Sequence, residues 1–368
     1  MKIGYIVQNL NDPAVERRCA MLSRGGAKVA LAGFCRDTIV AGGPAARDPL
    51  ILGISQDAAL LDRAKLTLKA VAFSGGLSQH LAGCNVIMAR NLEQLAIARR
   101  VARGRPIVYE CLDIHRSLVG SSAASRAVQA VEALLLPYVD LLLTSSPAFV
   151  SNHFGKRPLQ AKIRLVENKL LINEGFVPEF APLAPGEPLQ IGWFGMLRCR
   201  KTLEFLTRLV RSSNGRIEVL IAGKPSPAEL PDLATQVETV AGMRFTGPYR
   251  YDELPDLYGQ CHFAWTIDWF EEGLNSSWLL PNRLYEALAH GAIPIALADV
   301  EVGRWLEARG AGLLVSEPEH AENRLLDLTI GELAAMQNQL RSISRDELVA
   351  DDRDCVALVH DIAGAGIQ

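Results

Sequence analysis

The sequence predicts an α/β protein with two doubly wound domains. The chain has 368 residues, more than the ~100–200 of a typical domain. Its composition, 49% hydrophobic and 21% charged, is that of a globular protein. Short apolar runs rich in β-branched residues alternate with longer helical patterns, which is typical of βαβ units. Because ligands bind beyond the carboxyl ends of parallel strands, we expect two Rossmann-like domains that face each other across a functional cleft.

The N-terminal domain is expected to span residues 1–180, starting with the apolar run KIGYIV. Its predicted strands are 2–7, 28–33, 85–89, 106–110, 139–144 and 163–166. The gaps between them carry the 3.6-residue spacing of amphipathic helices. These predicted helices are 13–24, 58–71, 93–103, 122–136 and 146–154.

The C-terminal domain is expected at 181–350, because the alternation restarts after the Pro/Gly-containing stretch FAPLAPGEP. Its predicted strands are 190–195, 217–223, 243–247, 262–267, 292–297 and 312–315, and its last strong helical pattern is 330–342. The remaining tail, 351–368, ends in a short apolar run that could pack back on the N-terminal domain.

Hydropathy and cysteine usage predict a cytoplasmic protein. The most apolar stretch, 131–150, is interrupted by Glu132, Pro137 and Asp140, so it lacks the ~18 uncharged residues of a spanning helix. The N-terminus has neither a long apolar region nor a small-residue cleavage site, which argues against a signal peptide. Seven cysteines without a CxxC pair indicate reduced thiols rather than disulfides or a zinc site. We expect no metal and no cofactor.

Charge divides unevenly between the two halves of the chain. Residues 1–180 carry 22 Lys and Arg against 14 Asp and Glu (+8), so the remainder carries 16 against 27 (−11). The positive half suggests an anionic partner, either a membrane surface or a phosphorylated acceptor, although drift of surface charge explains it equally well. Residues 58–74 form a basic amphipathic pattern with Arg63, Lys65 and Lys69, and further arginines follow at 99, 100, 103 and 105. This pattern fits an anionic leaflet or, alternatively, a core-packed helix with a solvated edge. No nucleic-acid partner is expected.

Several common catalytic motifs are absent. The sequence has no GxGxxG and no GxxxxGK[ST], which disfavours dinucleotide oxidoreductases and P-loop NTPases. It also has no GxSxG and no HExxH.

The most distinctive segment is LLPNRLYEALAHGAIPIAL at 279–297. Pro281 is favoured at the first helical position, which places Arg283 in the first turn and Glu286 on the same face. A helix N-terminus beside an arginine suits a phosphate, and a glutamate one turn later can accept two hydrogen bonds from a ribose.

At this segment the chain resembles the GT-B-fold glycosyltransferases of group 1, also called family 4. The matching residues are Pro281, Asn282, Arg283, Glu286, Gly291 and Pro294. Further segments resemble the family in the same order, among them NDPAVERRCAMLSRGGAKVALAG, LVENKLL and IGWFGMLRCRKTLEFL. Within the family the chain looks most like the bacterial exopolysaccharide enzymes of the succinoglycan type.

The resemblance implies a nucleotide diphosphate sugar as donor, bound by the C-terminal domain. Its ribose would be held by Glu286, and its diphosphate by cations rather than by a metal ion. The family often has an arginine directly after the glycine turn at Gly195, where this chain has Met196, and Arg198 could replace it. The implied donor-binding residues are Gly195, Arg198, Lys201, Tyr249, Asn282, Arg283 and Glu286. Arg200 is a weaker candidate that is better explained as a solvated surface residue.

One departure from the family concerns a missing carboxylate. Many members have two glutamates separated by seven residues, but the first position here is Trp278. Glu272 or its neighbour Glu271 could act instead, or Ser276 and Ser277 could hold the sugar. Alternatively, this loop is only a surface excursion.

The predicted acceptor side lies in the N-terminal domain. Asp113 and His115 follow the strand 106–110, where relatives often have His-Asp, and they are catalytic candidates together with Glu272. A lone histidine is as often structural. Residues Asn9, Asn11 and Asp12 occupy the first βα loop, although an aspartate before Pro13 is also a good helix cap.

These observations together predict a glycosyltransferase that moves a sugar from a nucleotide diphosphate sugar to a saccharide acceptor, carried on a polyprenyl diphosphate. Family precedent implies a metal-independent reaction with retention of configuration, in which no protein nucleophile is needed. Two alternatives remain open: a non-catalytic two-lobed sugar-binding protein, and a GT-B nucleotide-sugar epimerase or hydrolase.

Overall fold

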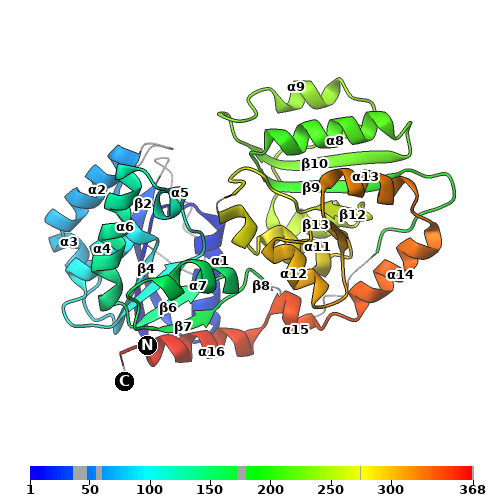
Figure 1. Ribbon diagram of the computed structural model, residues 1–368. Coiled ribbons are helices and arrows are strands. Elements are labelled where there is room, and N and C mark those ends of the chain that lie inside the picture. Colours follow the sequence, from blue (N-terminus) through cyan, green and yellow to red (C-terminus); the bar gives the residue numbers. More distant parts are fainter. Residues whose placement is uncertain (36–47, 55–59, 172–179, 274, 367–368) are drawn as a thin grey trace. The chain divides into compact units, whose positions relative to one another are not determined.

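The computed structural model describes residues 1–35, 48–54, 60–171, 180–273 and 275–366, with the backbone alone for 60–62 (Figure 1). Its contacts divide the chain into two units, Met1–Glu167 with Ala350–Gln368, and Asn168–Val349. The sequence placed this boundary at 180, at the Pro/Gly-containing stretch. Asn168 belongs with the second unit because its side-chain amide donates a hydrogen bond to the Leu280 carbonyl oxygen at 2.9 Å.

The first unit contains a seven-stranded parallel sheet in the order β3-β2-β1-β4-β5-β6-β7. Its strands are β1 (Lys2–Val7), β2 (Lys28–Cys35), β3 (Leu50–Ile54), β4 (Val86–Arg90), β5 (Ile107–Cys111), β6 (Leu141–Thr144) and β7 (Lys162–Leu165). All six predicted strands are confirmed. The edge strand β3 was not predicted, because its residues Ile51 and Ile54 are exposed and it lacks a buried apolar run.

Helices flank this sheet, and strands β4 and β5 are buried along their whole length. The helices are α1 (Pro13–Arg24), α2 (Leu60–Ala72), α3 (Gly75–His80), α4 (Leu92–Val101), α5 (Arg116–Val119), α6 (Ala123–Leu135) and α7 (Pro147–Asn152), with short 3-10 turns η1 (Leu136–Tyr138) and η2 (Phe154–Lys156). The five predicted helices are present within two residues at their starts, and α3 and α5 are additional.

The C-terminal tail forms helix α16 (Asp352–Ala363), which packs against α1 of the first unit. The contact is close at Gly25, where a Cβ atom would lie 2.2 Å from the Cys355 carbonyl oxygen. An ion pair between Arg164 and Asp361, with a distance of 3.3 Å between Nε and Oδ2, fastens α16 near β7. Residues 350–368 therefore belong to the first unit.

The second unit contains a six-stranded parallel sheet in the order β11-β10-β9-β12-β13-β14. Its strands are β9 (Leu189–Leu197), β10 (Ile217–Pro225), β11 (Met243–Phe245), β12 (Phe263–Trp265), β13 (Ile293–Leu297) and β14 (Leu313–Val315), at all six predicted positions. Two short strands, β8 (Leu170–Leu171) and β15 (Val349–Ala350), pair separately.

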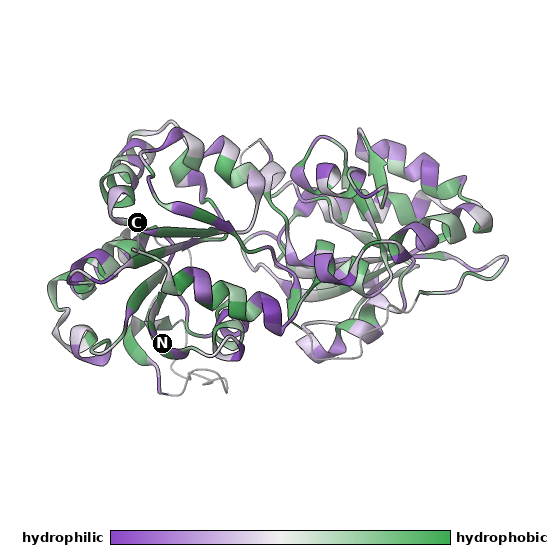
Figure 2. Cartoon of the chain, turned by 90° about the horizontal axis from the view of Figure 1, so that it is seen from below, coloured by the Kyte–Doolittle hydropathy of each residue, from purple (hydrophilic) through white to green (hydrophobic). Residues whose placement is uncertain are grey.

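Helices and 3-10 turns surround the second sheet. They are α8 (Arg200–Ser212), α9 (Leu233–Glu238), η3 (Tyr251–Glu253), α10 (Leu254–Tyr258), η4 (Asn275–Trp278), α11 (Asn282–Ala289), α12 (Glu301–Glu307), α13 (Pro318–Leu326), α14 (Ile330–Arg341) and α15 (Arg345–Leu348). Figure 2 shows hydrophobic residues concentrated along the strands of both sheets. The second core is mostly aliphatic and also holds packed aromatic rings, among them Phe205, which stacks on Trp265 with centroids 4.9 Å apart.

The strand order of each sheet reverses at one place. In the first sheet this switch point lies between β1 and β4, and in the second between β9 and β12. At a switch point the loops that follow two neighbouring strands run in opposite directions, which opens a crevice for a ligand. Within the described residues, no helix is both long enough and apolar enough to cross a bilayer.

Candidate functional site

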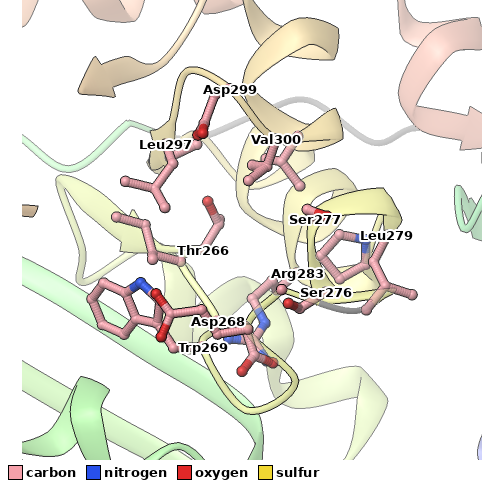
Figure 3. A pocket seen from close by; sticks show the side chains of 16 residues that line it. Thr266, Asp268, Trp269, Ser276, Ser277, Leu279, Arg283, Leu297, Asp299 and Val300 are labelled. Carbon is pink, nitrogen blue, oxygen red and sulfur yellow. The ribbon is translucent and has the colours of Figure 1, made fainter. Parts of the chain in front are cut away.

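A cavity of about 260 Å³ lies at the carboxyl ends of β12 and β13, next to the switch point of the second sheet (Figure 3). The loop that follows β12 forms one wall, and the start of α11 and the end of β13 contribute the others. The polar and aromatic side chains that line it include Thr266, Asp268, Trp269, Glu272, Ser276, Ser277, Arg283 and Asp299.

Asp268 lies between two of the predicted phosphate-binding arginines. Its Oδ2 atom is 3.9 Å from an Arg198 nitrogen and 3.7 Å from an Arg283 nitrogen. Its Oδ1 atom accepts a hydrogen bond from the Phe270 backbone N–H at 3.0 Å, which fixes the carboxylate. Asp268 was not among the residues predicted from the sequence, although its position just beyond a strand at the switch point was a usable signal.

Two aromatic side chains of the loop after β12 contact the predicted cations. The Arg198 guanidinium lies over the Phe270 ring at 4.5 Å, and the Lys201 ammonium lies over the Trp269 ring at 4.9 Å. Lys201 stands in the first turn of α8, so the N-terminus of that helix and its ammonium lie together. Two predicted cations, which follow β9, thus lie against the loop that follows β12.

Glu272 pairs with Lys201 rather than standing alone in the cavity. Its carboxylate oxygens lie 3.0 and 3.1 Å from the Lys201 Nζ atom, and both side chains are more than half exposed. Ser276 and Ser277 line the cavity, and the Ser276 hydroxyl donates to the Glu271 carbonyl oxygen at 2.7 Å. The loop is thus part of the cavity wall.

Arg200 points to a different partner. Its guanidinium donates a hydrogen bond to the Glu229 carbonyl oxygen, and the residue is exposed. This placement fits the surface role that the sequence analysis left open for Arg200.

Glu286 is buried at the inner side of α11, with 8% of its surface exposed. The helix begins one residue later than predicted, because Pro281 is its N-cap rather than its first residue, and Arg283 still lies in the first turn. The Tyr258 hydroxyl donates a hydrogen bond to Glu286 Oε2 at 3.3 Å. Burial and then the nearby Glu286 raise the pKa of Tyr258, so the phenol remains a donor. Tyr258 was missed, because nothing local in the sequence links it to α11.

Three further predicted donor residues lie in the second unit. Tyr249 packs edge-on against Phe194 at 6.5 Å, and burial followed by the charge of Glu286 raises its pKa. Gly195, near the end of β9, has a φ of 107°, a conformation that favours glycine. Asn282 is the exposed first residue of α11.

The first βα loop of the first unit is tied down by capping and an ion pair. Asp12 is the N-cap of α1 and accepts from the Ala14 N–H at 2.9 Å, while its Oδ2 atom lies 3.4 Å from Arg90. Asn9 Oδ1 accepts from the Asn11 N–H at 3.2 Å. The structure therefore gives Asp12 the capping role that the sequence analysis weighed against a role in binding.

A buried ion network lies beneath this loop. Glu110 accepts from Arg18 Nε at 2.5 Å, from Arg90 Nε at 2.8 Å and from the Tyr5 hydroxyl. Burial alone would raise the pKa of the Glu110 carboxyl, but Arg90 and then Arg18 lower it to about 2. The Glu110 carboxylate therefore stays ionised. It binds Arg90, and the Arg90 guanidinium in turn pairs with Asp12 at the switch point of the first sheet.

His115 and Asp113 lie in the loop after β5. His115 is the N-cap of α5: its Nδ1 atom accepts from the Ser117 N–H at 3.2 Å and lies 2.9 Å from the Ser117 hydroxyl. Asp113 is exposed in the same loop. The imidazole thus has a structural task, which the sequence analysis held open beside a catalytic one.

Sequence comparison provides one full-length relative. No family model matches the chain. The succinoglycan biosynthesis protein ExoL of Rhizobium meliloti (strain 1021) is 40% identical, in an alignment that covers all of this chain and 94% of ExoL. The chain belongs to the ExoL family. The resemblance to succinoglycan-type proteins that the sequence suggested is confirmed.

Comparison with solved structures identifies the fold of this chain. HepE of Anabaena, solved with UDP and glucose, superposes with a TM-score of 0.70 at 16% identity, covering 99% of this chain and 98% of HepE. The sucrose-phosphate synthase of Thermosynechococcus elongatus gives 0.67 at 14% identity, with coverages of 99% and 96%. The lipopolysaccharide outer core galactosyltransferase WaaB gives 0.55 at 13% identity, with 98% and 95%. These are GT-B glycosyltransferases, so the predicted GT-B fold is confirmed.

Proposed function

We propose that this chain is a glycosyltransferase that takes a sugar from a nucleotide diphosphate sugar. The observation that carries the proposal is the gathering of Arg198, Lys201 and Arg283 at the switch point of the second sheet, in the unit that also holds Glu286. Complexes of HepE with UDP and with UDP-glucose support a nucleotide sugar as donor. The name of the ExoL relative supports a place in succinoglycan biosynthesis.

Different residues would bind different parts of the donor. Arg198, Lys201 and Arg283 would compensate the charge of the diphosphate as it departs, which needs preorganised cations but no metal ion. Glu286 would accept hydrogen bonds from the ribose hydroxyls, with Tyr258 holding its carboxylate in place. Tyr249, beside Glu286, would contact the base.

The acceptor is proposed to be a saccharide on a polyprenyl diphosphate, and the reaction to retain the anomeric configuration. In such a reaction the departing diphosphate accepts the proton of the acceptor hydroxyl, so the protein needs no nucleophile. Asp113 and His115 of the first unit would orient the reacting groups on the acceptor side.

Nucleotide binding and product release test this proposal. A thermal-shift screen with UDP, GDP, ADP and dTDP should show stabilisation by one nucleotide, because a ligand that binds the native state raises its stability. A transferase releases free nucleoside diphosphate only when the acceptor is present. A hydrolase or epimerase would act without an acceptor, and a binding protein would release no product.

Asp268→Asn is expected to strengthen the binding of free nucleoside diphosphate several-fold. The carboxylate competes with a diphosphate for Arg198 and Arg283, and a partly exposed ion pair is worth up to about 1 kcal/mol. Asparagine keeps an oxygen for the Phe270 N–H. Calorimetry measures the change in affinity for the nucleoside diphosphate. Asp299→Asn, which changes another acid of the same cavity, is the matched control. Unchanged or weaker binding would show that Asp268 does not compete with the ligand.

His115→Ala is expected to lower kcat while leaving nucleotide affinity nearly normal, because His115 lies in the other unit from the donor residues. Loss of a helix cap alone costs about 0.5–2 kcal/mol of stability, so a second variant is needed. His115→Asn keeps a capping side chain without the imidazole, and kcat should fall in both variants. Full kcat in His115→Asn would assign the residue to capping only.

A further inference from the structure

Three helices of the first unit form a surface that the donor site does not use. Helix α4 packs against both α2 and α6 on the same sheet (Figure 1). Large hydrophobic side chains on the outer helices are exposed: Leu68 is 68% and Phe73, just beyond α2, is 80% exposed, and Leu134 of α6 is 72% exposed. Exposed large apolar side chains thus lie on both helices that flank α4.

The exposed side chains follow helical spacing. On α6 and the turn after it, Ala127, Val131, Leu134 and Tyr138 are exposed at intervals of three or four residues, so they form one stripe. The acid of that helix, Glu132, is fully buried against His153. The exposed stripe of α6 is therefore apolar.

Exposed cations lie on α2 and α4. Lys65 and Lys69 lie one turn apart on the exposed face of α2, and Arg99 and Arg100 end α4. The Arg99 guanidinium lies 3.8 Å over the Tyr138 ring, which joins the basic and apolar parts. We name this set the basic-apolar face; its residues are Lys65, Leu68, Lys69, Phe73, Arg99, Arg100, Val131, Leu134 and Tyr138.

Three residues of the sequence-based basic set, Arg63, Arg103 and Arg105, are not part of this face. Arg63 pairs with Glu93 at 2.6 Å, and Arg105 donates to the carbonyl oxygens of Val101, Ala102 and Leu81. The side chains of Leu60 and Leu61 lie outside the described part of the chain. Helix α6, which the sequence analysis did not include, provides the larger apolar share.

We propose that the basic-apolar face docks on an anionic lipid bilayer. Cations attract acidic headgroups, while aliphatic and aromatic side chains enter the boundary between headgroups and acyl chains. A second copy of this chain fits less well, because two such faces would oppose cations to cations. A bilayer would bring the enzyme to the lipid-linked acceptor that the proposed function names, but the docking itself does not depend on activity.

Vesicle sedimentation with the full chain tests the docking. Wild type should bind vesicles of phosphatidylcholine with phosphatidylglycerol, bind pure phosphatidylcholine weakly, and dissociate as salt is added. Lys65→Gln with Lys69→Gln should lower the affinity about 25-fold, since each cation near the surface contributes about fivefold. Leu68→Ser with Leu134→Ser should weaken binding by at least tenfold at every salt concentration.

The control is Lys28→Gln with Val356→Ser, an exposed cation and an exposed apolar residue of the same unit away from this face. It should bind vesicles like wild type. Failure of wild type to sediment with acidic vesicles at low salt, or equal loss in the control, would overturn the proposal. Dimers in the absence of lipid that the Leu68/Leu134 variant dissociates would assign the face to a second copy instead. Nucleotide binding, measured separately, shows whether the donor site stands independently of this result.

Discussion

Glu286→Ala is expected to weaken nucleotide binding by roughly 10- to 150-fold and to lower turnover to match. The proposed role of the buried carboxylate is to accept hydrogen bonds from the ribose. A hydrogen bond to a charged group contributes about 1.5–3 kcal/mol of binding free energy. Glu286 is oriented by Tyr258 and lies close to Tyr249, so its oxygens are held at one place before the ligand arrives. Calorimetric titration of the nucleotide into wild type and variant measures the loss.

Two conservative variants make this prediction specific. Glu286→Gln keeps one acceptor oxygen and should be less damaging than alanine. Tyr258→Phe keeps the buried ring and its stack on His290 but removes the hydroxyl that donates to Glu286, so it should weaken binding only a few-fold. Thermal melts establish that each variant is folded. A folded Glu286→Ala protein with wild-type affinity would remove Glu286 from the site.

Arg198→Ala and Lys201→Ala are each expected to lower kcat/KM at least tenfold, about 1.4 kcal/mol in the transition state. Both cations lie over aromatic rings of the loop after β12, which holds them ready for the diphosphate. If they do the work of a metal ion, turnover should survive EDTA. Initial rates of nucleoside diphosphate release, with and without the chelator, give both results.

Arg200→Ala is the matched control for these two variants. Arg200 stands between them in sequence, but its guanidinium donates to the Glu229 carbonyl oxygen. Its loss should change the rate less than twofold. A rate that EDTA abolishes and added divalent metal restores would contradict the proposed role of the cations, as would Arg200→Ala being as harmful as Arg198→Ala.

Much of the fold was predictable because it depends on local patterns. Eleven of the twelve predicted strands contain buried apolar side chains, and the segment from Pro281 to Glu286 carries its own helix start. The edge strand β7 was predicted from its sequence pattern although all four of its residues are exposed. The edge strand β3 was not predictable in this way, since its register with β2 shifts between Gly33 and Phe34, Ile51 and Ile54 are exposed, and none of its residues is fully buried. Such an edge strand is specified by its neighbour rather than by its own sequence.

The candidate site was only partly predictable, because its decisive contacts join distant segments. Asp268 meets Arg198 and Arg283 only after β9, β12 and α11 have assembled at the switch point. Tyr258 reaches Glu286 across the core in the same way. His115 and Asp12 illustrate the reverse case, since both were candidates by position and both act as helix caps in the structure.

We expect the second unit to bind a nucleoside diphosphate through cations and Glu286 without a metal ion. Calorimetric titration of UDP into wild type and into Arg283→Ala, both in EDTA, tests it most directly. Saturable binding to wild type and at least tenfold weaker binding to the variant are expected. Binding that requires a divalent metal, or that is equally tight in Arg283→Ala, would contradict it.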